Sequence, residues 1–145
     1  MPSFDAIAGV ATAGIAHGAL LADALNMPFA YVRAEAKSHG RKNRIEGDLS
    51  SFENILVVED LISTGGSSLQ VVDVLREEGK NVVGVIAIFD YGFDQARQNF
   101  QNQGVAYKTI TNYDTLIQVA NEKNYIREDD VRMLIEWRVD PQNWE

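Results

Sequence analysis

The chain has 145 residues, of which 46% are hydrophobic, so it suits one domain with a single core. Its formal net charge of −8 argues against general nucleic-acid binding, because such binding depends on many Lys and Arg contacts with phosphate. It has no cysteine and only two histidines, which excludes disulfides and thiolate metal sites and leaves a hard ion held by oxygen as the expected metal.

The opening residues MPSFDAIAG lack the features of a signal peptide, and no run of about 18 apolar residues occurs, so we expect a cytoplasmic protein without a membrane partner.

The first half of the chain alternates short apolar segments with helical patterns, which predicts βα units and a mainly parallel sheet. Strands are predicted over Phe4–Val10 and Phe29–Arg33. A helix rich in Ala and Leu is predicted between them, over Ile15–Leu25.

A basic segment follows the second predicted strand. Five of the thirteen basic residues fall within twelve positions, and they are Arg33, Lys37, Arg41, Lys42 and Arg44. Taken alone, such a run is more often a solvated loop, but the acidic background of the chain makes it a candidate anion site. The polar stretch continues to Gly47 without periodicity, and loops of this length are often lids or binding loops.

The second half of the chain continues the alternation. Strands are predicted over Ile55–Glu59, Val82–Phe89 and Val105–Ile110. Helices are predicted over Ser67–Glu78, Phe93–Gln103, Tyr113–Asn124 and Asp129–Arg138. No internal repeat or linker divides the chain, so residues 1–145 are expected to form one domain of the α/β class.

The stretch ILVVEDLISTGGSSL carries the strongest chemical signal. Glu59 and Asp60 end a purely apolar strand, at the edge where open α/β sheets bind ligands. Neighbouring strand residues point to opposite faces, so both acids cannot face the core, and ionised carboxylates suit the two hydroxyls of a ribose. Small and hydroxyl-bearing residues then lead into a helix N-terminus, where free amides bind anions; they are Ser63, Thr64, Gly65, Gly66, Ser67 and Ser68. This order predicts a ribose 5-phosphate socket.

Each part of that stretch alone is more often structural, with the acids beginning a turn and Ser67 capping a helix. Their order on one strand–loop–helix unit favours the ligand-binding interpretation. No lysine follows the glycines and G-x-G-x-x-G does not occur, so neither a Walker A loop nor a dinucleotide fingerprint is present. The segment GVATAG has the glycine spacing of Walker A but lacks its Lys and Ser.

The segment VVEDLISTGGSS resembles the phosphoribosyl pyrophosphate (PRPP) signature of type I phosphoribosyltransferases. Four further segments, IAGVATAGIAHGALLADAL, YVRAEAKSHG, NRIEG and IEWR, are similar to the orotate phosphoribosyltransferases of that family. The resemblance covers essentially the whole chain. It implies a Rossmann-like, mainly parallel sheet flanked by helices, with a long flexible catalytic loop and a small hood.

The resemblance also implies roles for individual residues. Glu59 and Asp60 would hold the ribose hydroxyls, and residues 63–68 would hold the 5′-phosphate. A loop of Thr12, Ala13 and Gly14 would offer amides to pyrophosphate. Arg33 and Lys37 would neutralise the leaving pyrophosphate, His39 would lie in the catalytic loop, and Ser63 and Tyr91 would face orotate. His17 is interpreted as an ordinary histidine on the first helix.

The implied activity is that of a pentosyltransferase of pyrimidine biosynthesis. It moves the 5-phosphoribosyl group from PRPP to orotate, which gives orotidine 5′-phosphate and pyrophosphate. Mg²⁺ would be the cofactor, bound mainly through PRPP rather than by a protein cage. The implied assembly is a homodimer in which Lys37 and His39 act in trans.

The sequence departs from the family at three places. Some orotate enzymes have Lys at the position of Ala34 and Arg at the position of Tyr91. Family members also carry a segment before the first strand that supplies much of the hood, and that segment is not in this sequence. Two alternatives therefore stay open: a PRPP- or nucleotide-binding module with little turnover, and a purine phosphoribosyltransferase.

Overall fold

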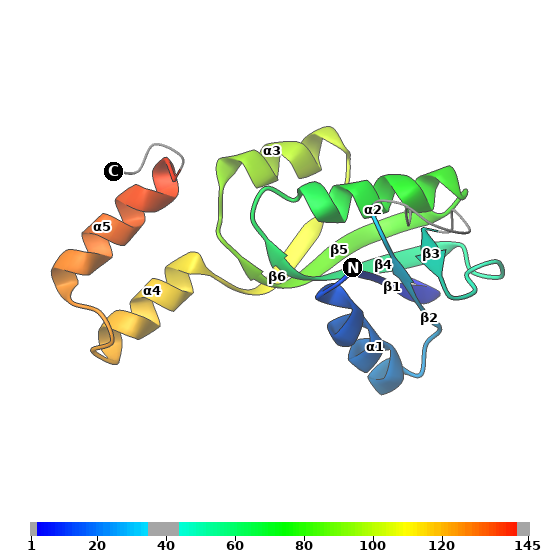
Figure 1. The fold of residues 1–145 in the computed structure, drawn as a ribbon, viewed down its shortest axis with the longest axis horizontal. Coiled ribbons are helices and arrows are strands. Elements are labelled where there is room, and N and C mark those ends of the chain that lie inside the picture. Colours follow the sequence, from blue (N-terminus) through cyan, green and yellow to red (C-terminus); the bar gives the residue numbers. More distant parts are fainter. Residues whose placement is uncertain (1–2, 35–43, 142–145) are drawn as a thin grey trace.

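The computed structural model describes residues 3–34 and 44–141. Strands and helices alternate along most of the chain (Figure 1). In order, the elements are β1 (Ala6–Val10), α1 (Gly14–Leu25), β2 (Phe29–Val32), β3 (Ile45–Glu46), β4 (Asn54–Ile62), α2 (Gly66–Glu77), β5 (Asn81–Asp90), α3 (Asp94–Asn102), β6 (Tyr107–Asn112), α4 (Tyr113–Glu122) and α5 (Glu128–Val139). None of the helices in these described ranges is long and apolar enough to cross a membrane.

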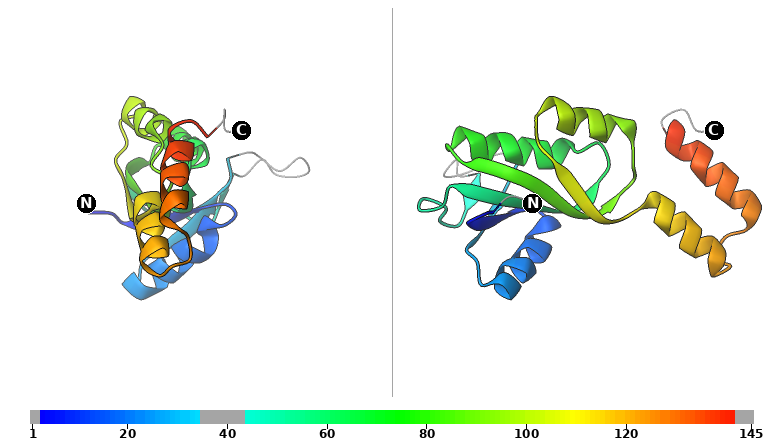
Figure 2. Two further views of the ribbon diagram at one scale, coloured as in Figure 1. Left: turned by 90° about the vertical axis from the view of Figure 1, so that its left-hand side faces the viewer. Right: turned by 180° about the vertical axis from the view of Figure 1, so that it is seen from behind.

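The strands form one six-stranded sheet in the order β3-β2-β1-β4-β5-β6. All neighbouring pairs are parallel except β2 with β3, which is antiparallel. Helix α1 covers one face of the sheet, while α2 and α3 lie on the other (Figures 1 and 2). The predicted α/β fold with a mainly parallel sheet is therefore confirmed.

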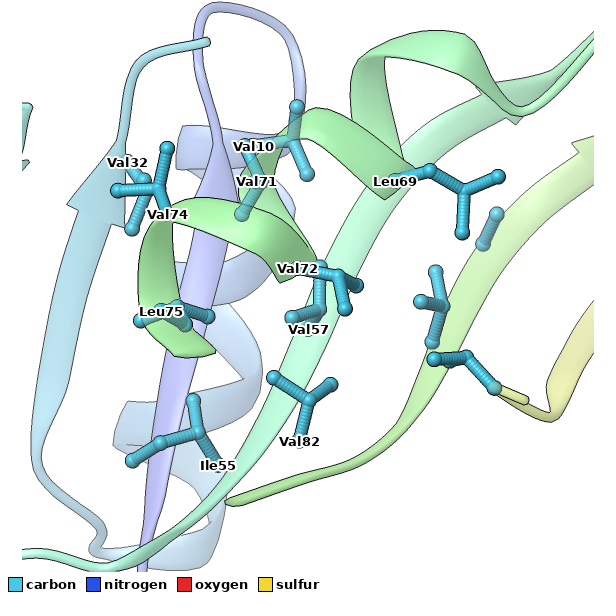
Figure 3. Packing of buried hydrophobic residues seen from close by; sticks show 14 of the residues in the cluster. Val10, Val32, Ile55, Val57, Leu69, Val71, Val72, Val74, Leu75 and Val82 are labelled. Carbon is cyan, nitrogen blue, oxygen red and sulfur yellow. The ribbon is translucent and has the colours of Figure 1, made fainter. Parts of the chain in front are cut away.

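The larger core lies between the sheet and α2 (Figure 3). Helix α2 buries apolar residues toward the sheet at Leu69, Val72 and Leu75, as its three-residue spacing predicted. Strand β4 is buried continuously from Ile55 to Glu59, as expected where helices cover both faces of a parallel strand. A smaller cluster on the α1 face includes Ile7, Ala22, Leu56 and Val58.

Most strand ends lie within two residues of the sequence prediction, but the sheet departs further from it at two places. Strand β4 does not end at Glu59 but runs to Ile62, because β5 continues to pair with it through Leu61↔Phe89 and Ile62↔Asp90. The short strand β3 was not predicted, and it pairs with β2 through Val32↔Ile45 within a stretch that shows no periodicity. In both cases pairing with the neighbouring strand decides where the strand lies and ends, and a pairing partner leaves no local signal in the sequence.

Helices α4 and α5 form a hairpin that projects from the sheet (Figure 2). Trp137 of α5 meets Tyr113, Tyr91 and Phe93, with ring centroids 5.3, 5.9 and 5.9 Å away. Arg138 also forms an ion pair with Asp114. These aromatic contacts join the hairpin to the segment after β5.

Candidate functional site

The two adjacent acids of β4 have different environments. Glu59 is buried, with 5% of its surface exposed, whereas Asp60 is partly exposed. The Glu59 carboxyl accepts hydrogen bonds from Ser68 Oγ (3.1 Å) and from the Asp60 N–H (3.1 Å). Burial, with help from the neighbouring Asp60 side chain, raises the pKa of Glu59 to about 8. The alternation of a strand thus separates the acids as the sequence predicted, and Glu59 is directed at α2 rather than at solvent.

The predicted phosphate loop forms a cavity of about 290 Å³ with the end of β4. Its lining consists of Glu59, Leu61, Ser63, Thr64, Gly65, Gly66, Ser67, Ser68 and Gln70. Gly65 is the N-cap of α2, and no side chain caps this end of the helix. The first amides of a helix have no partner within the helix, and they carry the positive end of its dipole. All six loop residues named from the sequence are brought together at a site suited to an anion.

The hydroxyls of this loop are not equivalent. The Ser68 side chain is buried and its hydroxyl donates to Glu59, so this hydroxyl already has a partner within the fold. Ser63 and Ser67 also line the cavity, but no partner in the described part of the chain occupies their hydroxyls. The sequence interpretation grouped these serines, and the fold distinguishes them.

Helix α3 packs against the loop 63–68 through two contacts. Gly65 has φ +80°, and a Cβ at that position would lie 2.5 Å from Cε2 of Phe100, so only glycine fits there without displacement. Phe100 is buried and stacks on Tyr107 at 4.3 Å. The neighbouring Asn99 donates from Nδ2 to the Thr64 carbonyl at 2.9 Å. Neither contact could be predicted from sequence patterns, because Asn99 lies 35 residues after Thr64 and Phe100 follows it directly.

The predicted pyrophosphate loop lies beside the same strand. Thr12 and Ala13 are exposed, and Gly14 is buried against β4. A Cβ on Gly14 would lie 2.6 Å from the Val58 carbonyl oxygen and 3.4 Å from Glu59 Oε1. The loop from β1 and the acid pair of β4 are therefore neighbours at the carboxyl edge of the sheet.

Arg33 stands at the end of β2, on that same edge. Its guanidinium lies over the Tyr31 ring, 5.3 Å from the centroid, and donates to the Tyr31 hydroxyl at 3.4 Å. Its Nε is buried with no partner among the described residues. Lys37 and His39 lie outside the described residues, so their predicted positions and the predicted flexible loop stay predictions.

Tyr91 follows β5 and donates its N–H to the Ile62 carbonyl at 3.1 Å, which places it next to the end of β4. Its ring stacks on Phe93 at 5.4 Å. His17 lines a separate, apolar cavity of about 330 Å³ on the α1 face. In the described ranges no three His, Asp or Glu residues gather as a metal site.

Comparison with known proteins identifies the family. The model of the phosphoribosyl transferase domain matches residues 2–129. The chain belongs to the phosphoribosyltransferase family. This confirms the resemblance found in VVEDLISTGGSS.

Two curated relatives of this phosphoribosyltransferase are named orotate phosphoribosyltransferase. The protein from Cytophaga hutchinsonii is 50% identical over 143 residues, which cover 99% of this chain and 68% of the relative. The protein from Bacteroides fragilis is 52% identical over 141 residues, which cover 97% of this chain and 66% of the relative. The chain thus spans about two thirds of the length of these relatives.

A solved structure of orotate phosphoribosyltransferase from Aeropyrum pernix has a similar fold. The TM-score is 0.68 at 29% identity, and the match covers 79% of this chain and 63% of that one. The sheet and its helices are therefore those of a phosphoribosyltransferase. The roles of individual residues rest on the family resemblance and on the local geometry.

Proposed function

We propose that this chain carries the catalytic core of an orotate phosphoribosyltransferase, which transfers the 5-phosphoribosyl group of PRPP to N1 of orotate. The observation that carries the proposal is the cavity at the start of α2, where the predicted ribose acid Glu59 and the predicted phosphate loop 63–68 meet. Identity of 50% and 52% to proteins named for this activity supports orotate as the acceptor.

The geometry supports a division of labour between the acids. Asp60 is the more exposed one, so it is the better placed to accept hydrogen bonds from ribose hydroxyls. Glu59 holds Ser68 and the Asp60 amide, and so connects the strand to the phosphate-binding helix. The free amides around Gly65 and Gly66 would receive the 5′-phosphate.

The bond between C1 of the ribose and pyrophosphate breaks with oxocarbenium character, by analogy with glycoside chemistry. No covalent nucleophile is needed. Arg33 and the amides of residues 12–14 would stabilise the departing pyrophosphate from the same edge of the sheet. Lys37 and His39 are proposed to complete this side from the catalytic loop.

Mg²⁺ fits this proposal as an ion carried by the substrate. The carboxylate and hydroxyl groups at the site are hard oxygen donors, and Mg²⁺ is commonly bound by substrate phosphates and water with few protein ligands. When bound, it would neutralise charge on the pyrophosphate of PRPP. Asp60 would hold the ribose to which that pyrophosphate is attached.

The assembly and location are proposed on the same basis. A homodimer with the catalytic loop acting in trans, and a place in the cytoplasm, follow from the resemblance and from the sequence composition. Gel filtration coupled to light scattering would test the dimer, and a monomer that retains full turnover would contradict action in trans.

The direct test of function is pyrophosphate release from Mg·PRPP in the presence of orotate, adenine, guanine or xanthine. Of the four bases, only orotate should support release of pyrophosphate. Asp60→Asn should slow this release strongly. Asp23→Asn, on the exposed side of α1, should not change it. Lys37→Ala should also slow release, and an unchanged rate would remove its leaving-group role.

Three other outcomes would change the proposal. Release with a purine instead of orotate would favour a purine phosphoribosyltransferase. Binding of Mg·PRPP in calorimetry without orotate-dependent release would favour a binding module with little turnover. If neither PRPP binding nor an effect of Asp60→Asn were seen, the phosphoribosyl proposal would be wrong for this chain.

A further inference from the structure

Helix α3 makes a polar contact with the predicted phosphate loop, residues 63–68. The phosphate binding proposed above uses the amides of the loop itself and assigns no role to this contact. Asn99 Nδ2 donates to the carbonyl oxygen of Thr64 at 2.9 Å. Thr64 and Gly65 both line the cavity at the start of α2, whereas Asn99 does not. The contact therefore reaches the loop from outside the cavity.

The Asn99 side chain is held in the one orientation that allows this contact. Gln95, one turn earlier on α3, donates from Nε2 to Asn99 Oδ1 at 2.8 Å. A carbonyl oxygen only accepts hydrogen bonds, so the amide nitrogen of Asn99 must face Thr64 and its oxygen must face Gln95. Gln95, Asn99 and Thr64 form a short chain of hydrogen bonds with a fixed direction.

This chain fixes the peptide plane between Thr64 and Gly65. That peptide is trans, so its carbonyl and its N–H point in opposite directions. With the Thr64 carbonyl turned to Asn99, the Gly65 N–H is turned to the cavity side. No backbone carbonyl in the described ranges accepts the Gly65 amide. Because glycine has few steric limits, this plane would otherwise rotate easily.

We propose that Asn99 is a positioning residue for the 5′-phosphate: by holding the Thr64 carbonyl it aims the Gly65 amide into the phosphate cavity. The inference rests on the proposed function, because it assigns the cavity to a phosphate. Gln95 acts indirectly, because its hydrogen bond orients the Asn99 amide. Neither residue touches the substrate.

The test measures binding of ribose 5-phosphate and, separately, of pyrophosphate by calorimetry. Asn99→Ala should weaken ribose 5-phosphate binding about 2- to 12-fold, since one hydrogen bond is worth about 0.5–1.5 kcal/mol. Asn99→Asp should weaken it more, because a carboxylate cannot donate to the Thr64 carbonyl and its oxygens repel the carbonyl oxygen. Gln95→Ala should have a smaller effect. Pyrophosphate binding should not change in any of them.

Exposed Gln98 on the same helix supplies matched controls. Gln98→Ala controls for truncation on α3, and Gln98→Glu controls for added negative charge on the same helix. Both should bind ribose 5-phosphate like the parent. In amide NMR spectra, ribose 5-phosphate should shift the Gly65 resonance in the parent and in the Gln98 variants, and this shift should shrink in Asn99→Asp.

The outcomes separate this inference from the function on which it rests. If the parent binds ribose 5-phosphate and the Asn99 and Gln95 variants bind it equally well, Asn99 has no positioning role. Equal loss of ribose 5-phosphate and pyrophosphate binding would indicate general damage and would also contradict the inference. If the parent binds neither ribose 5-phosphate nor PRPP, the proposed function is wrong and the inference falls with it.

Discussion

Two regions of the molecule differ in how deeply their residues are buried. One is the unit of β4 and α2, and the other is the hairpin of α4 and α5. Helix α2 buries six residues, from Ser68 to Leu75, and β4 is buried over five consecutive positions. Helix α5 has no buried residue, and α4 buries two, Tyr113 and Ile117. Apolar burial is the main favourable term in folding, so stability should be concentrated in the first unit.

The candidate site lies in the well-buried unit. Glu59 of β4 and the loop 63–68 line one cavity, and the hydrogen bond from Ser68 to Glu59 joins α2 to β4. The hairpin meets this region through the aromatic contacts of Trp137. Substitutions in β4 and α2 should therefore lower both stability and ligand binding. Substitutions in the hairpin should change stability and leave ligand binding intact.

The largest expected difference is between Leu75→Ala and Met133→Ala. Leu75 is fully buried in α2, so the truncation should lower the free energy of unfolding by about 2–5 kcal/mol. Met133 on α5 is 46% exposed, so its truncation should cost about 0.5 kcal/mol or less. Urea unfolding measures both, and similar costs would contradict the contrast between the units.

Gly65→Ala tests the phosphate loop itself. The left-handed φ and the clash with Phe100 should together cost about 2 kcal/mol or more of unfolding free energy, and displacement of the loop should weaken ribose 5-phosphate binding by on the order of tenfold or more. Gly79→Ala is the control, because Gly79 has φ +74° with no atom near its missing Cβ. That variant should cost about 1 kcal/mol and bind normally. Equal binding losses would show that the effect is not local.

Trp137→Ala should loosen the hairpin. Aromatic pairs are worth about 0.5–1.5 kcal/mol each beyond burial, and Trp137 has three of them, so a cost of about 1.5–4.5 kcal/mol is expected. Limited proteolysis should then cut faster between α4 and α5, while ribose 5-phosphate binding is retained. Loss of that binding would mean that the hairpin supports the phosphate loop directly.

Glu59→Gln should change how stability depends on pH. Because the pKa of Glu59 is raised to about 8 in the fold, the native state keeps a proton that the unfolded chain releases above its ordinary value of 4.5. The stabilising contribution is complete below that lower value and is lost as the pH rises toward 8. Denaturant unfolding between pH 5 and 8 should show a shallower decline in Glu59→Gln than in the parent, and parallel curves would argue against a protonated Glu59.

The sequence by itself determined the class of fold, the order of most elements and the family. Short apolar segments and the three-residue spacing of helix positions report which residues are buried, and a contiguous motif such as VVEDLISTGGSS keeps its chemistry in one stretch of chain. For the same reason the motif alone predicted Glu59 and the six loop residues 63–68, which line one cavity in the fold.

Only the tertiary structure decided what each of those groups contacts. It extended β4 to Ile62 through pairing with β5, turned Ser68 onto Glu59, and brought Asn99 and Phe100 under the loop. These partners lie 9 to 35 residues apart or on neighbouring strands. Such contacts depend on packing in three dimensions, which leaves no periodic or contiguous trace in the sequence.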